Sequence, residues 1–144
     1  MAWTAPRTWV SGELVTAALF NVQLKDNLTI LKTVINNSGR LEFAAATDLS
    51  IVSGVITVTQ NFHTVDTQGD ASTDDLVTIT AGANVGTGFV LCLAPFNDGR
   101  TVVLKNGVSG AANLSLGGDL TMDTIEKTVA LIYDGSNWKR LSYL

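Results

Sequence analysis

The feature that most constrains the fold of this chain is a change of residue pattern near Arg40. From Arg40 to Leu144, short runs rich in β-branched and aromatic residues alternate with segments of Gly, Asn and Asp. Residues of the first kind favour strands, and those of the second kind favour tight turns. The predicted strands are Leu49 to Val52, Val55 to Thr59, Phe62 to Asp66, Leu76 to Thr80, Phe89 to Leu93, Arg100 to Leu104, Asn113 to Leu116, Asp119 to Met122, Thr128 to Tyr133 and Trp138 to Tyr143.

Many short strands with no helix between them are typical of a sandwich or a jelly roll. The run LIYDGSNW, from Leu131 to Trp138, predicts a hairpin, because an Asp-Gly pair favours the tight turn between two strands. We therefore predict a mainly β protein in which residues 40–144 form a jelly-roll-like β sandwich, preceded by an extended arm and one long helix.

The stretch from Val15 to Ile35 has a helical pattern, and we predict an oligomerisation helix over residues 13–37. Thr16 is the predicted N-cap, and Glu13 lies beside the positive end of the helix. Asn36 and the residues up to Gly39 predict the end of the helix. Six residues follow the alternating spacing of a heptad seam: Ala17, Asn21, Leu24, Leu28, Leu31 and Ile35.

Two roles for this helix stay open. A buried seam would hold copies of the chain together, and Asn21 on it would fix the register or the number of copies. Further apolar residues widen the face, so the helix could instead pack on the sheet as an ordinary amphipathic helix. A helix of this length is marginal alone in water, so self-association would also need the β domain.

Residues 1–12 form a predicted docking arm. Trp3 and Trp9 lie on either side of Pro6, which disfavours a helix there. The two indole rings are costly to leave in water, so they either fold back on the chain's own domain or bind a neighbouring subunit. Both alternatives stay open.

The composition argues against nucleic-acid and membrane partners. The formal net charge is -4 and no run of Lys or Arg is present, whereas phosphate binding needs clustered cations. No apolar run reaches the roughly 20 residues that span a bilayer. The first ten residues, MAWTAPRTWV, also lack the apolar core of a secretory signal.

The sequence predicts no enzymatic activity and no cofactor. His63 is the single histidine, and we expect it to be a strand residue with a satisfied ring rather than a catalytic base. Cys92 is the single cysteine and lies in the apolar run FVLCL, so we expect a buried, unreactive thiol. No nucleophile turn of the form GxSxG and no zinc-ligand spacing is present.

Four carboxylates gather between Asp66 and Asp75, the other two being Asp70 and Asp74. Converging carboxylates could bind calcium, but the spacing does not match an EF-hand loop. We expect a solvated hairpin loop and no metal site, although the sequence leaves calcium open.

The N-terminal segment WTAPRTWVSGELVTAALFNVQLKDNL resembles the start of small structural proteins of tailed bacteriophages. In these, a short Trp-containing arm leads into a helix of the form GE-VTA-LN--L-DNL. The corresponding positions here are Gly12-Glu13, Val15-Thr16-Ala17, Phe20-Asn21, Leu24 and Asp26-Asn27-Leu28. The hairpin Tyr133-Asp134-Gly135 with Trp138 is similar to the YDG-x-x-W hairpin that closes phage surface-module β domains.

The resemblance implies a homotrimeric protein of the virion surface, made in the cytoplasm of a bacterial host. The expected function is that of a capsid decoration (cement) protein, whose partners are its own copies and the major capsid or tail proteins. The alternative is a short tail-fibre or receptor-binding component. A carbohydrate-binding β domain is a third possibility, for which Trp138, Tyr133 and Tyr143 would have to supply an exposed aromatic cluster.

Overall fold

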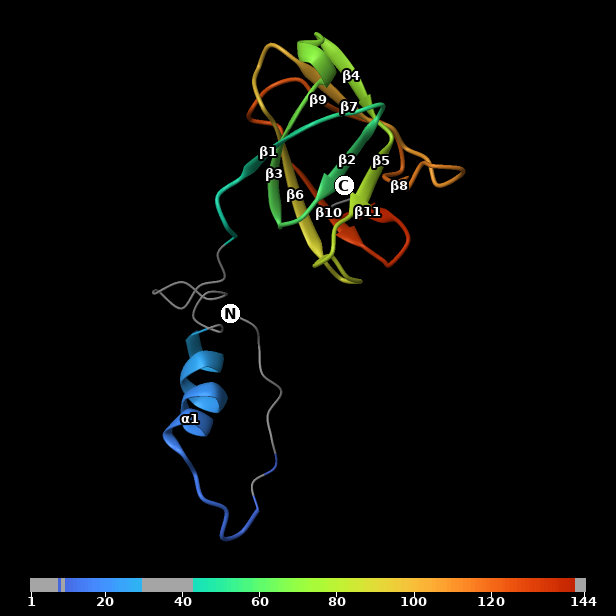
Figure 1. Cartoon of the computed structure of the whole chain (residues 1–144). Helices are drawn as coiled ribbons and strands as arrows, with labels where there is room; N and C mark the ends of the chain where they lie inside the picture. The colour runs from blue at the N-terminus through green and yellow to red at the C-terminus, as the bar shows by residue number, and fades with distance from the viewer. Residues whose placement is uncertain (1–7, 9, 30–42, 142–144) are drawn as a thin grey trace. The chain divides into compact units, whose positions relative to one another are not determined.

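A computed structural model of the chain describes residues 8, 10–29 and 43–141 (Figure 1). The chain divides into two units, Met1–Phe43 and Ala44–Leu144. The first unit holds the described helix, and the second holds the strands.

The helix of the first unit begins with α1, Ala17–Phe20, and continues as a π-helical stretch, Asn21–Asp26, with helical residues up to position 29. Thr16 is its N-cap, as predicted: the threonine hydroxyl accepts a hydrogen bond of 3.2 Å from the backbone N–H of Leu19. This bond satisfies one of the N–H groups that a helix start leaves without a partner.

The described helix is shorter than the predicted range of residues 13–37. Residues 13–16 are not helical, and residues 30–37 lie outside the described part of the chain. The π-helical stretch also differs from the prediction. Its i→i+5 hydrogen bonds shift the positions of the side chains around the axis relative to an α-helix, and a heptad pattern does not reveal such a shift.

The second unit contains eleven strands in its described residues (Figure 1). Their bounds are β1 Thr47–Ser50, β2 Val55–Val58, β3 Phe62–Asp66, β4 Thr73–Leu76, β5 Thr78–Ala81, β6 Val90–Pro95, β7 Thr101–Leu104, β8 Leu114–Ser115, β9 Leu120–Met122, β10 Val129–Tyr133 and β11 Trp138–Arg140. A short 3-10 helix, Gln68–Asp70, lies between β3 and β4.

Three sheets share these strands. The largest has the order β1-β3-β6-β10-β11-β8, and the smaller ones are β2-β5 and β4-β7-β9. The chain visits the sheets in turn, because β3, β4 and β5 belong to three different sheets, and β6 then returns to lie beside β3. The strands from β1 to β7 therefore stack as successive turns of one coil.

The stacking makes most of the strand pairs parallel. Five of the eight pairings among the described strands are parallel: β1–β3, β3–β6, β2–β5, β4–β7 and β8–β11. Parallel pairing of strands from consecutive turns is the arrangement of a parallel β-helix. The later strands β9 and β10 reverse direction and pair antiparallel with β7 and β6.

The prediction of a mainly β fold is confirmed, and its jelly-roll detail is not. A jelly roll is built from antiparallel strands joined in Greek keys, whereas parallel pairs predominate here. The residue pattern identified the strands but carried no information about which strands would become neighbours.

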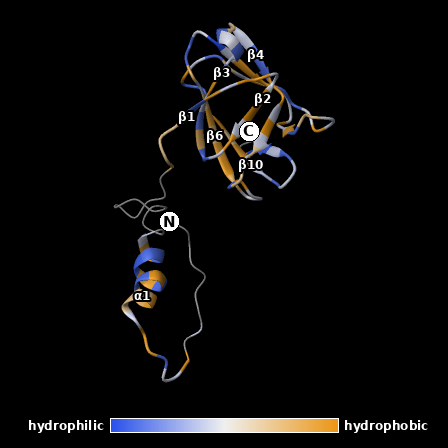
Figure 2. Ribbon diagram, in the orientation of Figure 1, coloured by the Kyte–Doolittle hydropathy of each residue, from blue (hydrophilic) through white to orange (hydrophobic). Residues whose placement is uncertain are grey.

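The core lies between the three sheets. Inward-facing residues alternate with outward-facing ones along each strand, and they form one buried cluster. Figure 2 shows hydrophobic residues along β6 and β10, which supply several members of this core. The fully buried members include Ile51, Val58, Leu76, Ile79, Leu91, Leu93, Leu104, Leu114, Met122, Leu131 and Trp138.

The predicted hairpin is present, formed by β10 and β11 with Tyr133 opposite Trp138. Asp134 organises its turn, since one carboxylate oxygen accepts hydrogen bonds from the N–H groups of Ser136 at 2.9 Å and Asn137 at 2.7 Å. Gly135 has a φ of +100°, a conformation that favours glycine. The local sequence therefore determines this turn.

Candidate functional site

The first candidate site is the helix predicted to join copies of the chain. The described members of the seam, Ala17, Asn21, Leu24 and Leu28, are all exposed in the single chain. Leu24 is 46% exposed and Leu28 is 63% exposed. The other two predicted members, Leu31 and Ile35, lie outside the described residues.

Other apolar side chains of the same helix are exposed as well. Phe20 is 53% exposed and Val22 is 38% exposed, and no residue of α1 or of the π-helical stretch is buried. Contiguous exposed apolar surface marks an interaction site more often than scattered single residues do. The π-helical stretch adds to this argument, since such turns are frequent at functional sites.

The second candidate site is the arm of residues 1–12, of which residues 8 and 10–12 are described. The predicted docking residues Trp3 and Trp9 lie outside the described part of the chain. Their role therefore stays a prediction.

His63 is fully buried in β3, and its ring nitrogens have hydrogen-bond partners, as predicted for a strand residue with a satisfied ring. Its Nε2 atom accepts hydrogen bonds from the backbone N–H groups of Thr59 and Gln60, both at 3.3 Å. Its Nδ1 atom lies 2.7 Å from the Thr47 hydroxyl and 3.1 Å from the Thr47 carbonyl oxygen. With Nε2 accepting, the ring is neutral, and Nδ1–H donates to Thr47.

The acidic loop is organised around Arg100. The guanidinium forms an ion pair with Asp66 and a second with Asp70, the latter at 2.7 Å. The hydrogen bond to Asp66 raises the pKa of Arg100. The other oxygen of Asp66 accepts a hydrogen bond of 2.8 Å from the N–H of Thr67. Asp66 and Asp70 thus meet at the same guanidinium nitrogen, Nη1 of Arg100.

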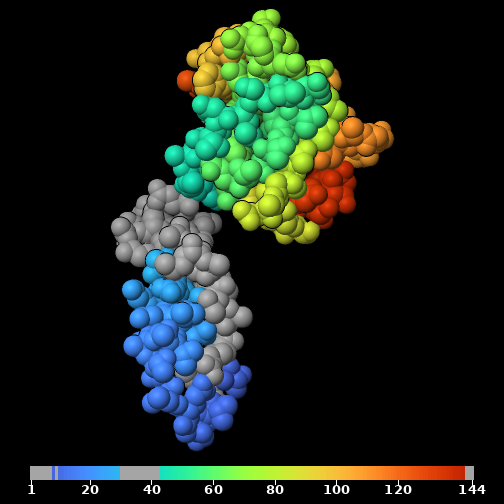
Figure 3. All heavy atoms as spheres, in the orientation of Figure 1, coloured from blue at the N-terminus to red at the C-terminus, as the bar shows by residue number. Residues whose placement is uncertain are grey.

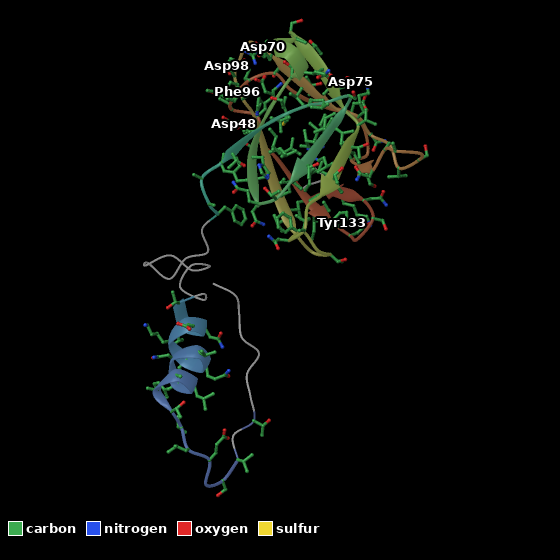
Figure 4. The ribbon with its side chains drawn as sticks, in the orientation of Figure 1. Asp48, Asp70, Asp75, Phe96, Asp98 and Tyr133 are labelled. Atoms are coloured by element: carbon green, nitrogen blue, oxygen red, sulfur yellow. The ribbon has the colours of Figure 1, made fainter. Side chains whose placement is uncertain are left out.

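Asp74 is bonded within the loop too, since its two oxygens accept from the N–H groups of Gln68 and Asp75, both at 2.8 Å. No group of three or more His, Cys, Asp or Glu side chains among the described residues is placed to hold a metal ion. Figure 4 shows Asp70 and Asp98 at one end of the β unit and Tyr133 at the other.

A cavity of about 330 Å³ lies beside the loop that joins β9 and β10. Leu120 and Val129 contribute apolar surface, and Thr121, Lys127 and Arg140 contribute polar groups. Within residues 43–141, Arg140 is the one cation without an ion pair. The sequence pattern did not predict this cavity, because its walls come from strands of two different sheets.

Of the aromatic residues proposed for carbohydrate binding, the two described ones, Trp138 and Tyr133, do not form an exposed cluster. Trp138 is fully buried, with its ring centre 4.8 Å from that of Tyr133 and in edge contact with Phe89. A sugar-stacking platform needs an exposed ring face, which Trp138 lacks. Tyr143 lies outside the described residues.

Cys92 differs from its prediction. The thiol is partly exposed rather than buried, because Cys92 alternates along β6 with the inward-facing Leu91 and Leu93 and so faces outward. An apolar run such as FVLCL does not tell which of its residues face outward.

The loop after β7 protrudes from the β unit (Figure 3) and carries Val108, which is 60% exposed.

Among the described residues, no helix is long and apolar enough to cross a membrane. No protein family, curated protein or solved structure matches this chain.

Proposed function

We propose that the chain is a non-enzymatic structural protein of a bacteriophage virion, acting as a homotrimer on the particle surface. The observation that carries this proposal is the helix at residues 17–29, whose apolar side chains Phe20, Leu24 and Leu28 are exposed in the single chain. Such a helix is marginal in water without a partner, and copies of the same helix would bury this surface.

The homotrimer would place three copies of the helix side by side around a common axis. Asn21 is exposed on the predicted seam, where a polar residue selects a register and a number of copies at some loss of stability. The resemblance of residues 3–28 to phage structural proteins, in which trimers are usual, supports the choice of three copies.

A structural role agrees with the surroundings of His63. Both ring nitrogens are engaged with backbone or hydroxyl groups, so neither is available to accept a proton from a nucleophile. The thiol of Cys92 has no histidine beside it. Cys92 faces outward on β6, whereas the single histidine, His63, faces the core from β3.

Capsid decoration is the favoured role because the chain combines a single β unit with an N-terminal segment rich in tryptophan. Attachment would come from Trp3 and Trp9, and the β unit would stay on the outside of the particle. A short tail-fibre or receptor-binding component is the alternative, since both roles require the same helix-mediated trimer.

Removal of the arm tests the favoured role. A chain without residues 1–10 should remain a trimer, by light scattering, and should no longer bind particles that lack the protein. Large aromatic side chains dominate many interfaces, so Trp3→Ala or Trp9→Ala alone should weaken particle binding by more than about tenfold.

The matched control is Val108→Ala, an exposed apolar change on the β unit that should leave particle binding unchanged. Should the shortened chain misfold while both tryptophan variants bind particles normally, the arm belongs to its own subunit. That result would favour the tail component instead.

A further inference from the structure

The first strand of the β unit, β1, buries little surface of its own. It lies at one edge of the six-stranded sheet and pairs with β3 alone. Three of its four side chains are exposed, and only Leu49 packs against the core. A short edge strand with few buried apolar contacts opens at a lower free-energy cost than the strands inside a sheet.

Two side chains from the region where β2 turns into β3 bind β1 and the residues just before it. The side-chain amide of Gln60 donates a hydrogen bond of 2.8 Å to the carbonyl oxygen of Ala45. The Nδ1–H of His63 lies within hydrogen-bond distance of both the hydroxyl and the carbonyl oxygen of Thr47. Residues 45–50 are thus held at their beginning by Gln60 and His63, and along β1 by the pairing with β3.

The ring of His63 fits this position only in its neutral form. Nε2 faces two donors, the backbone N–H groups of Thr59 and Gln60, and the side chain is fully buried. A protonated ring carries a hydrogen on both nitrogens, so Nε2–H would point at two other N–H groups. Burial of an unpaired charge is costly as well. Uptake of a proton therefore requires the ring to leave this site.

No carboxylate among the described residues of the surrounding elements faces the ring. His63 points inward, in one row with Thr47 and Leu93. The titratable side chains of the three strands involved occupy outward positions: Asp48 on β1, Asp66 on β3 and Cys92 on β6. Asp66 is paired there with Arg100. Residues 55–61, which form β2 and the turn, and β5 contain no titratable side chain.

We propose that His63 is an acid-sensitive latch for β1. The neutral ring holds residues 45–50 on the β unit, and protonation releases them. The first unit ends at Phe43, so these residues follow the helix-bearing unit directly in the chain. Their release extends the segment that leads from the first unit into the sheet, while the remaining strands keep their pairing.

The direction of the pH dependence follows from the proton balance. An imidazole in water takes up a proton at about pH 6.5. Above this pH the ring is neutral in the closed and the released states, and β1 is held fully. Below it the released state binds a proton that the closed state does not. The equilibrium constant for release then rises by up to about tenfold for each pH unit.

Hydrogen exchange of the full chain, followed by mass spectrometry at about pH 7.5 and about pH 5, measures this release. After correction for the intrinsic effect of pH on exchange, the protection of residues 45–50 should fall by up to about thirtyfold, at tenfold for each pH unit below about 6.5. The hairpin of β10 and β11 should keep its protection, because it does not contact His63 in the strand pairing.

His63→Gln is the matched variant. Its amide offers a donor and an acceptor but takes up no proton, so the protection of residues 45–50 should be the same at both pH values. Asp48→Asn removes the other titratable group of β1 and should leave the pH dependence of the wild type in place.

The ring itself gives a second measurement, which does not depend on any variant. His63 is the single histidine, so its ring-proton signal in NMR spectra of the untagged chain is unambiguous. This signal should stay at the position of a neutral ring while β1 is protected, and should move to that of a charged ring only as the protection of residues 45–50 is lost.

Three results would each overturn the latch. Protection of residues 45–50 that is the same at both pH values in the wild type shows that protonation does not release β1, whatever the ring signal does. A pH dependence that persists in His63→Gln assigns the release to another group. Equal loss of protection in β1 and in the β10–β11 hairpin shows that the whole unit unfolds in acid.

Discussion

The indole Nε1 of Trp138 donates a hydrogen bond of 2.9 Å to the carbonyl oxygen of Ile79, 59 residues earlier in the chain. The bond joins β11 of the largest sheet to β5 of the smallest one. The same carbonyl accepts from the side-chain amide of Asn113, also at 2.9 Å. A residue of the terminal hairpin thus connects sheets that share no strand pair.

Trp138→Ala should therefore destabilise the β unit as a whole. The change leaves a large cavity where the fully buried ring contacts Phe89 and Tyr133, and such truncations cost about 3–5 kcal/mol. Urea unfolding followed by circular dichroism measures the loss. Tyr133→Phe is the control, because it removes only an exposed hydroxyl bond and should cost about 1 kcal/mol or less. A loss below 1 kcal/mol for Trp138→Ala would contradict the assigned role.

His63→Leu should also destabilise the unit, although leucine suits a buried position. The change leaves the N–H groups of Thr59 and Gln60 without their acceptor, and a fully buried group left unsatisfied costs about 1–3 kcal/mol. Thr59 is exposed and Gln60 is half-buried, so water replaces part of the lost bonding and the expected total is about 1–3 kcal/mol by urea unfolding. Thr47→Val removes one hydroxyl from the same network and should cost about 1 kcal/mol. Equal stability of His63→Leu and wild type would show that the network contributes little.

The turn of the hairpin should make the free energy of unfolding depend on pH in the acidic range. Hydrogen bonds from the N–H of Asn137 and from Lys139 hold the pKa of Asp134 at about 2, below its ordinary value of 3.8. A lowered folded-state pKa gives stability that is present above about pH 4 and is lost as the pH falls towards 2. Asp134→Asn should remove this part of the pH dependence, as thermal melts between pH 5 and 2 would show.

Lys139→Gln is the control for that experiment, because it removes the ion pair and keeps the backbone hydrogen bonds to Asp134. Most of the pH dependence should remain in this variant, since the Asn137 bond is the largest cause of the shift. Identical melting curves for wild type and Asp134→Asn across the range would contradict the lowered pKa.

A chelator should leave the melting temperature unchanged. Arg100 already forms ion pairs with Asp66 and Asp70, and Asp74 is bonded to the backbone of its own loop. EDTA followed by added calcium is the direct measurement. A melting temperature that falls by several degrees and is restored by calcium would reveal a site in this loop.

The parts of the fold that depend on neighbouring residues could be predicted from the sequence. The predicted strand Phe62 to Asp66 has the same bounds as β3, and Thr16 caps the helix as its position before the apolar pattern indicated. The hairpin from Leu131 to Trp138 follows from its Asp-Gly turn. In each case the signal and its structural result lie within a few residues of each other.

Pairing between distant strands could not be predicted in this way. The predicted strand Leu76 to Thr80 is in fact parts of β4 and β5, divided at Val77, where the chain passes from one sheet to another. The N–H groups of Val77 and Thr78 both bond to the carbonyl of Gly54, which has a φ of +77°. Such a corner depends on a residue more than twenty positions away, so no local pattern marks it.

Prediction of the candidate contact residues from the sequence is limited in the same way. The apolar spacing of the helix predicted Leu24 and Leu28 as contact residues, and both are exposed. The outward placement of Cys92 and Ile132 depends on the register of three strands, which the sequence does not reveal. Spacing alone could propose contact residues on the helix, whose contacts stay a prediction, while it could not group residues on one sheet face.

The helix itself gives the most direct test of self-association. Leu24→Asp with Leu28→Asp places two charges on the exposed seam, where burial in an oligomer should be worth roughly 1.5–3 kcal/mol for each leucine. The double variant should dissociate at micromolar concentration, as multi-angle light scattering would show. Lys25→Asp introduces the same carboxylate at an exposed position beside the seam and should leave the oligomer intact. The β unit should keep its melting temperature in the monomer to within a few degrees, because none of its fully buried core residues belongs to the helix. An unchanged molar mass for the double variant would limit the helix to a role within its own chain, whatever the β units do.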